Sequence, residues 1–373
     1  MFEFFRTSES TIKVGRSPTS GLSGHLLPVR SGKRILARAG LLAIACLFAN
    51  ASRAADAALI AAAQKEGHVV WYTTQILNQF ARPAADAFQK TYGISVDVVR
   101  ADASEVALRI LNEARAGKVL ADVFDGTTAV VALKKAGLVL KWSPDSAQRL
   151  PSEDRDGEGY WTGTNLYVIT PGFNTDLIPK GSEPRAYADL LDPRWKGRMV
   201  WNSSPAISAS AGFIGVVLAE MGEDKGMEYL RALSRQNIAG LQVAARQVLD
   251  QVIAGEFAIA LGIFNNHAVI SAAQGAPVAW IAMNPAMSVL SVVSVIKEPP
   301  HPNAGKLLVD FLVSEAGQKI YRDADYMPID AATPARDESL RPDGVKFRAI
   351  SFTPERIVAN MPKWSGVFQQ LFR

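Results

Sequence analysis

Small polar side chains follow five stretches of this sequence that are expected to be strands. The candidate ligand-binding residues in these clusters are Thr73, Thr74, Ser104, Thr127, Thr128, Asn202, Ser203, Ser204, Asn265 and Asn266. Hydroxyls and carboxamides donate and accept single hydrogen bonds. Such groups suit a neutral or anionic organic solute.

Each cluster stands where a helix is expected to begin. In open α/β sheets, ligands bind beyond the carboxyl ends of the strands, where helix N-termini offer free N–H groups to an anion. Ser, Thr and Asn are also the ordinary helix caps, which explains any single cluster equally well. Five clusters in one chain favour a shared cleft. Arg246 could pair with an anion there, and a surface arginine is the alternative.

Strands and helices alternate along the chain and must position these clusters. Strands are expected at 68–73, 94–99, 121–124, 165–170, 198–201, 257–263, 278–282 and 289–296. The main helices are expected at 83–92, 127–136, 206–221, 225–234, 247–254 and 303–321. The order favours a parallel or mixed sheet covered by helices, and two α/β lobes fit the length better than one. In the tail, short helices at 354–360 and 364–372 are expected to pack on the first lobe.

The first 54 residues are organised like an export signal. Basic residues within 33–38 precede a short apolar run at 39–49, and Ser52 and Ala54 are small residues that a signal peptidase reads. We expect cleavage near Ala54 and a periplasmic mature chain. A core helix at 39–49 and lipid attachment at Cys46 are the alternatives.

Charge and cysteine content narrow the classes of function. The chain carries 40 Lys and Arg against 36 Asp and Glu, and eight of the basic but only two of the acidic side chains lie in the leader. The remaining body has a net charge of −2, which leaves no basic face for nucleic acid. Cys46, the only cysteine, also lies in the leader, so the body has no disulfide and no thiol nucleophile.

Signatures of catalysis are absent from the sequence. It has no P-loop, no GxGxxG and no HExxH motif, and His68, His267 and His301 lack metal-ligand spacing. Ser208 and Ser210 faintly resemble a nucleophile elbow without its first glycine. We therefore expect no enzyme activity, metal or cofactor. A periplasmic serine hydrolase built on either serine is the enzymatic alternative.

Several stretches of the chain resemble ABC-importer solute-binding proteins of the ferric-iron type. In the family's order, over roughly 57–335, they are 66–74, 88–96, 121–124, 172–175, 189–197, 252–260 and 315–321. The most specific is Leu-Asp-Pro-Arg-Trp-Lys-Gly at 191–197.

This resemblance implies a type II periplasmic binding protein fold, of the α/β class, with two lobes joined by crossover hinge strands. After the leader at 1–54, lobe 1 would comprise 55–163 plus 284–373 and lobe 2 would comprise 164–283. The implied function is an extracellular receptor of an ABC importer, monomeric, which traps a small polar or anionic ligand by hinge closure. Its implied partner is the permease in the inner membrane.

One position departs from the ferric-binding pattern. Those members place two adjacent tyrosines after the strand equivalent to 257–263, where this chain reads Phe264-Asn265-Asn266. We therefore expect a neutral or anionic organic solute, for example a carboxylate or phosphonate, with Arg246 setting the charge preference. Two further alternatives stay open, namely ferric iron or a ferric chelate (with Tyr72, Tyr160 or Tyr167 as ligands) and a sensor subunit that reports to a receptor kinase.

Overall fold

The computed structural model describes residues 57–203, 209–342 and 345–372. The expected cleavage near Ala54 and the alternative at Cys46 lie outside these ranges, as do Ser204 and Ser208. Residues from Ala55 to Arg373 form one compact unit. None of the described helices combines the length and apolar character that crossing a membrane requires.

The described strands and helices alternate as the sequence predicts. The strands are β1 (His68–Thr73), β2 (Ser95–Arg100), β3 (Val123–Gly126), β4 (Thr162–Asn174), β5 (Met199–Asn202), β6 (Ala239–Leu241), β7 (Ile259–Phe264), β8 (Val278–Trp280), β9 (Ala286–Val295), β10 (Met327–Pro328) and β11 (Ala349–Phe352). After a helix at 57–66, the helices are α2 (Arg82–Tyr92), α3 (Ala103–Arg115), α4 (Ala129–Lys135), α5 (Ala209–Met221), α6 (Glu223–Ser234), α7 (Ala245–Ile253), α8 (Asn265–Ala273), α9 (Pro302–Val313), α10 (Glu315–Asp323) and α11 (Pro354–Leu371).

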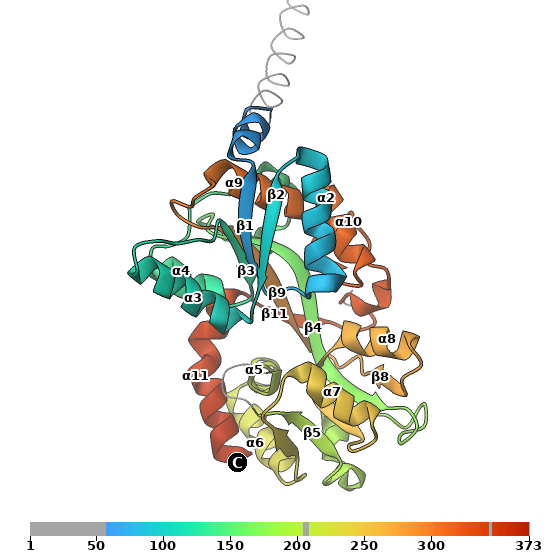
Figure 1. Ribbon diagram of the computed structural model, residues 1–373. Coiled ribbons are helices and arrows are strands. Elements are labelled where there is room, and N and C mark those ends of the chain that lie inside the picture. The colour runs from blue at the N-terminus through green and yellow to red at the C-terminus, as the bar shows by residue number, and fades with distance from the viewer. Residues whose placement is uncertain (1–56, 204–208, 343–344, 373) are drawn as a thin grey trace, which may run out of the picture. The chain divides into compact units, whose positions relative to one another are not determined.

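One mixed sheet joins two groups of parallel strands. Its order is β2-β1-β3-β9-β4-β7-β5-β6, with β8 and β10 also paired to β4 and β11 paired to β9. β1 is parallel to β2 and β3, and β5 is parallel to β6 and β7. The long antiparallel strands β4 and β9 run between the two groups (Figure 1). The α/β class is confirmed, and β4 and β9 occupy the place of crossover strands.

Local sequence signals explain several element ends. Helix α2 ends at Gly93, whose φ of 75° is left-handed and favours glycine. The Asp102 backbone N–H donates to Glu105 Oε2 (3.1 Å), as a capping box requires at the start of α3. The expected helix 303–321 is broken, however, because Ser314 is extended and caps α10 instead. Gly317 permits that break, since a Cβ there would lie 2.2 Å from the Phe311 carbonyl oxygen.

The described residues form two large hydrophobic cores, one toward each end of the crossing strands β4 and β9. The first core gathers buried side chains from 63–161 and 290–329. The second core gathers them from 173–289 and 352–368. β9 is buried along its whole length and contributes to both cores, which is consistent with its apolar sequence.

The tail differs from expectation. It forms a single helix of 18 residues, α11, rather than two short ones, and it continues through Pro362. Trp364, Val367 and Phe368 are buried in the second core rather than the first. A Cβ at Gly215 of α5 would lie 2.6 Å from the Trp364 ring, so this close approach needs glycine. α11 lies beside α5 and α6 (Figure 1).

Candidate ligand-binding site

A fully buried carboxylate, that of Asp125 on β3, holds the end of β1. Its Oδ1 accepts hydrogen bonds from the Thr74 backbone N–H (2.8 Å) and hydroxyl (2.7 Å). Its Oδ2 accepts from Trp71 Nε1 (2.9 Å) and from the Thr73 hydroxyl. Burial raises the pKa of Asp125, and these hydrogen bonds oppose that shift. Thr73 is fully buried, so its side chain shapes the loop, whereas Thr74 is partly exposed.

The turn after β3 brings three of the predicted clusters together. Gly126 has a φ of +146°, a conformation that favours glycine. A Cβ there would lie 3.2 Å from Thr74 Cγ2, 3.6 Å from Ala103 Cβ and 3.7 Å from Ala129 Cβ. The ends of β1 and β3 therefore meet the starts of α3 and α4 at this glycine.

Two of the predicted residues line one cavity. Ser104 and Thr128 border a space of about 370 Å³ between α3, α4 and Val358 of α11. The remaining side chains around it are Ala, Val and one charged residue, Lys135. Thr128 also lines an adjacent space of about 300 Å³ that α11 closes on the other side. Thr127, next in the chain, is partly exposed.

The predicted residues at the ends of β5 and β7 are of two kinds. Some side chains already bond to other protein atoms, and others are left for a ligand. Asn202 is buried and its Nδ2 donates to the Val243 carbonyl, while Asn265 Nδ2 donates to the Leu340 carbonyl (2.9 Å). Both amides thus tie a strand end to a neighbouring segment. Asn266 is buried at the start of α8, and its Oδ1 has no hydrogen-bond partner within the described part of the chain. Ser203 is partly exposed.

Arg246 on α7 is the single charged side chain among the predicted residues, and it contacts α8. Its Nη1 donates to Ser271 Oγ on α8 (2.9 Å), and its guanidinium pairs with Asp250 one turn along α7 (2.9 Å). Burial and the Arg246 charge lower the pKa of His267 to about 4, against the opposing effect of Asp250. The imidazole is therefore neutral at neutral pH, and half-exposed Arg246 carries the local positive charge.

Two side chains that connect the two groups, Gln75 and Tyr167, are not among the predicted residues for an organic ligand. Gln75 is fully buried after β1, and its Nε2 donates to Ser291 Oγ (3.0 Å) and Asn165 Oδ1 (3.3 Å). Tyr167 on β4 donates its hydroxyl to Gln75 Oε1 (3.0 Å), and its ring centroid lies 5.1 Å from that of Phe264. The signals in the sequence were the position of Gln75 beside Thr73 and Thr74, and Tyr167 as a possible ligand of ferric iron.

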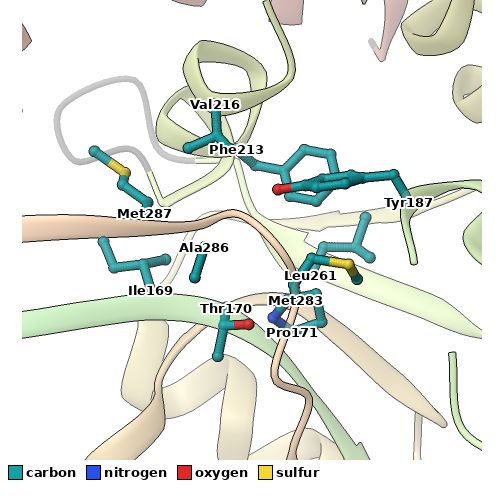
Figure 2. Close-up of a pocket in the computed structure, with 10 residues that line it drawn as sticks. All are labelled: Ile169, Thr170, Pro171, Tyr187, Phe213, Val216, Leu261, Met283, Ala286 and Met287. Atoms are coloured by element: carbon teal, nitrogen blue, oxygen red, sulfur yellow. The ribbon is translucent and has the colours of Figure 1, made fainter. Parts of the chain in front are cut away.

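A small apolar cavity lies beside the same strands in the second core. It measures about 10 Å³, which is room for about one water molecule. Figure 2 shows Ile169 of β4 and Met287 of β9 among its lining side chains. Its two side-chain hydroxyls are already used, since Thr170 donates to the Ile281 carbonyl and Tyr187 to the Pro285 carbonyl (2.7 Å). This cavity is a packing gap rather than a solute site.

Within 57–203, 209–342 and 345–372, no three His, Cys, Asp or Glu side chains are grouped so that they could hold a metal ion. Burial raises the pKa of Tyr167 well above its usual value, which keeps the phenol protonated.

The sequence of the chain matches a known protein family. Residues 120–353 match the family described as bacterial extracellular solute-binding protein. The match spans more than half of the chain, and the chain belongs to this family. The resemblance drawn from the sequence motifs is confirmed, and with it the role of a solute-binding receptor of the ABC-importer type.

Three similar proteins illustrate the range of the family. A Salmonella typhimurium protein named as a candidate 2-aminoethylphosphonate-binding periplasmic protein is 23% identical over 312 residues, which cover 81% of this chain and 85% of that protein. Iron-bound HitA from Pseudomonas aeruginosa superposes with a TM-score of 0.67 at 22% identity, covering 82% of this chain and 99% of HitA. AfuA from Actinobacillus pleuropneumoniae, with fructose 6-phosphate bound, gives 0.67 at 20% identity, covering 81% and 99%. The two structures confirm the type II periplasmic binding protein fold.

Proposed function

We propose that this protein is a periplasmic receptor, not an enzyme, that delivers a small organic anion to the permease of an ABC importer. The observation that carries the choice of ligand is the charge around the cavity of about 370 Å³, where Ser104 and Thr128 meet Lys135 and no carboxylate. A space of this size suits a small solute. An anion there gains charge-assisted hydrogen bonds without facing a like charge.

The predicted residues then divide by role. Thr74, Ser104, Thr127 and Thr128 would contact the ligand from the first core, and Ser203, Ser204, Asn266 and Arg246 from the second. Thr73, Asn202 and Asn265 would hold the loops in place, because their polar groups already bond to protein atoms.

Two lobes would close on the ligand about β4 and β9, as hinged binding proteins do. Lobe 1 would be built on the first core and would comprise 55–163 together with the segment from 284 to about 330. Lobe 2 would be 164–283 together with α11, whose buried side chains belong to the second core. A monomer would suffice, since both halves of the site come from one chain.

Ferric iron and serine hydrolysis are the less favoured alternatives. The carboxamides of Asn265 and Asn266 are neutral, whereas Fe³⁺ favours anionic oxygen donors, and the phenol of Tyr167 resists ionisation. Ser210 is 3% exposed within α5, which does not suit a nucleophile. The family comprises binding proteins. Export to the periplasm is supported by the leader pattern and by the periplasmic relative from Salmonella typhimurium.

The test is a ligand screen on the mature chain. Thermal shift and titration calorimetry would use 2-aminoethylphosphonate, fructose 6-phosphate, citrate and a ferric salt. We expect at least one organic anion to raise the melting temperature, and Lys135→Gln, in the lining of the cavity, to weaken its binding about tenfold, as loss of one charge-assisted hydrogen bond should. Arg235→Gln, at the exposed end of α6, is the matched control. Stabilisation by the ferric salt alone would contradict the proposed ligand class.

A further inference from the structure

Tyr167 stands at an unusual place on the crossing strand β4. Most of β4 is buried, but Leu166, Tyr167 and Ile169 are partly exposed at its centre. In the antiparallel ladder with β9, Asn165 is opposite Ser291 and Tyr167 is opposite Val289. Residues two apart on a strand share one face, so Asn165 and Tyr167 point to the same side of the sheet as Ser291.

The Tyr167 hydroxyl completes the hydrogen bonds of a buried amide. Gln75 Nε2 donates to Ser291 Oγ (3.0 Å) and Asn165 Oδ1 (3.3 Å), which fixes the orientation of the carboxamide. Its Oε1 is then left as an acceptor, and Tyr167 donates to it at 3.0 Å. Because Gln75 is fully buried, removing this donor leaves the amide oxygen without a replacement from solvent. The hydroxyl therefore fixes the loop that follows β1.

The Tyr167 ring reaches the opposite group of site residues. Its centroid lies 5.1 Å from that of Phe264, which in turn lies 5.2 Å from that of His267. Phe264 is the N-cap of α8 and immediately precedes Asn265 and Asn266. One side chain thus contacts the end of β1 through its hydroxyl and the start of α8 through its ring.

We propose that Tyr167 is the positioning residue that couples the loop at 73–76 to the start of α8, so that both halves of the site hold their ligand-competent arrangement together. This inference rests on the proposed function. If the loop is ordered in only a fraction of molecules, the apparent Kd rises by the inverse of that fraction. Tyr167→Phe should keep the ring packing, lose the hydrogen bond and weaken anion binding about tenfold.

The matched control is Tyr326→Phe. The Tyr326 hydroxyl also faces this loop, where it accepts a long hydrogen bond from the Ile76 N–H (3.5 Å). Its ring packs edge-to-face on Tyr167 (centroids 5.9 Å apart), but among the described residues no hydrogen bond joins it to Gln75. Calorimetry with 2-aminoethylphosphonate, or with the anion that binds in the screen, should show less than a twofold change for Tyr326→Phe. Equal weakening by both variants, or wild-type affinity of Tyr167→Phe, would overturn the proposal.

A second measurement needs no ligand. Hydrogen exchange of the backbone amides should become about tenfold faster in both 73–76 and 264–267 in Tyr167→Phe, with the rest of the chain unchanged. A merely local packing role would affect only one segment, and a general loss of stability would affect all segments. Either result contradicts the coupling. If the wild-type chain binds no anion at all, the proposed function fails, while this exchange experiment still decides the role of Tyr167.

Discussion

Individual residues of the site divide into those that hold its loops and those that set its charge. Asp125 belongs to the first kind, because four donors surround its carboxylate and fix the end of β1 against β3. His267 belongs to the second kind. It lies between the ring of Phe264 and the charges of Arg246 and Asp250, and burial keeps it neutral. In the proposed site, a neutral His267 would leave Arg246, paired with Asp250, as the cation available to an anionic ligand.

The low pKa of His267 predicts a pH dependence of stability. The pKa is about 4 in the folded chain, below the ordinary 6.5, so the unfolded chain binds the proton more readily. The contribution of His267 to the free energy of unfolding is complete above pH 6.5, and about 3 kcal/mol of it is lost as the pH falls to 4. Urea unfolding of wild type and His267→Gln at pH 4.5 and 7.5 measures it.

The wild type and His267→Gln must be compared because Asp154 also titrates between pH 4 and 6.5. Burial raises the pKa of Asp154 to about 6, which stabilises the folded chain as the pH falls, with the opposite sign. That contribution is common to both proteins and cancels in the difference. Parallel pH profiles of the wild type and His267→Gln would show that His267 is not a buried neutral imidazole.

Among the secondary-structure elements, α11 is the one whose place the sequence did not reveal. Its second half packs in the second core, and Lys363 pairs with Glu223 of α6. Its first turn reaches the first core, where Glu355 Oε1 accepts from Trp161 Nε1 (2.9 Å). Between these contacts, Val358 faces the cavity lined by Ser104 and Thr128. α11 therefore touches both cores and borders the candidate site.

Removing the anchor of α11 should strongly destabilise the second core. Trp364 is 3% exposed and packs against Gly215 and the ring of Phe352. We expect Trp364→Ala to lower the free energy of unfolding by about 3–5 kcal/mol, as large-to-small core substitutions do. Chemical denaturation gives the value, with Val358→Ala, 40% exposed on the same helix, as a control expected within about 0.5 kcal/mol. Similar losses in both variants would place the anchor elsewhere on α11.

For the molecule as a whole, residues 55–373 form one compact unit that contains the fold and the site. The export pattern at 33–54 predicts that the leader is removed before function.

Secretion should therefore yield a chain that starts at Ala55. When the full-length chain is produced in a bacterium with a periplasm, we expect intact-mass spectrometry of the periplasmic protein to match residues 55–373 with no lipid. A Cys46→Ser variant should be exported and processed in the same way. A mature protein that begins at Cys46 and carries acyl chains would contradict cleavage near Ala54.

Much of the fold could be predicted because it depends on local patterns. The β-α alternation, the stop at Gly93 and the cap at Asp102 and Glu105 arise from interactions a few residues apart. The prediction of one helix at 303–321 was wrong for an equally local reason, because Ser314 caps a new helix. The second-core location of Trp364 could not be predicted, because its apolar pattern is compatible with either core.

The sequence by itself determined the α/β class, the order of its elements and the polar clusters at their ends, because hydrophobic periodicity and capping are local. Only the tertiary structure decided which clusters meet. It placed Thr74 at Gly126 and brought Ser104 and Thr128 to one cavity. It used Thr73, Asn202 and Asn265 to hold loops, and it brought Tyr167 between Gln75 and Phe264. Those contacts join residues up to about a hundred positions apart, and side-chain burial and hydrogen bonding at that distance follow from how the strands pair.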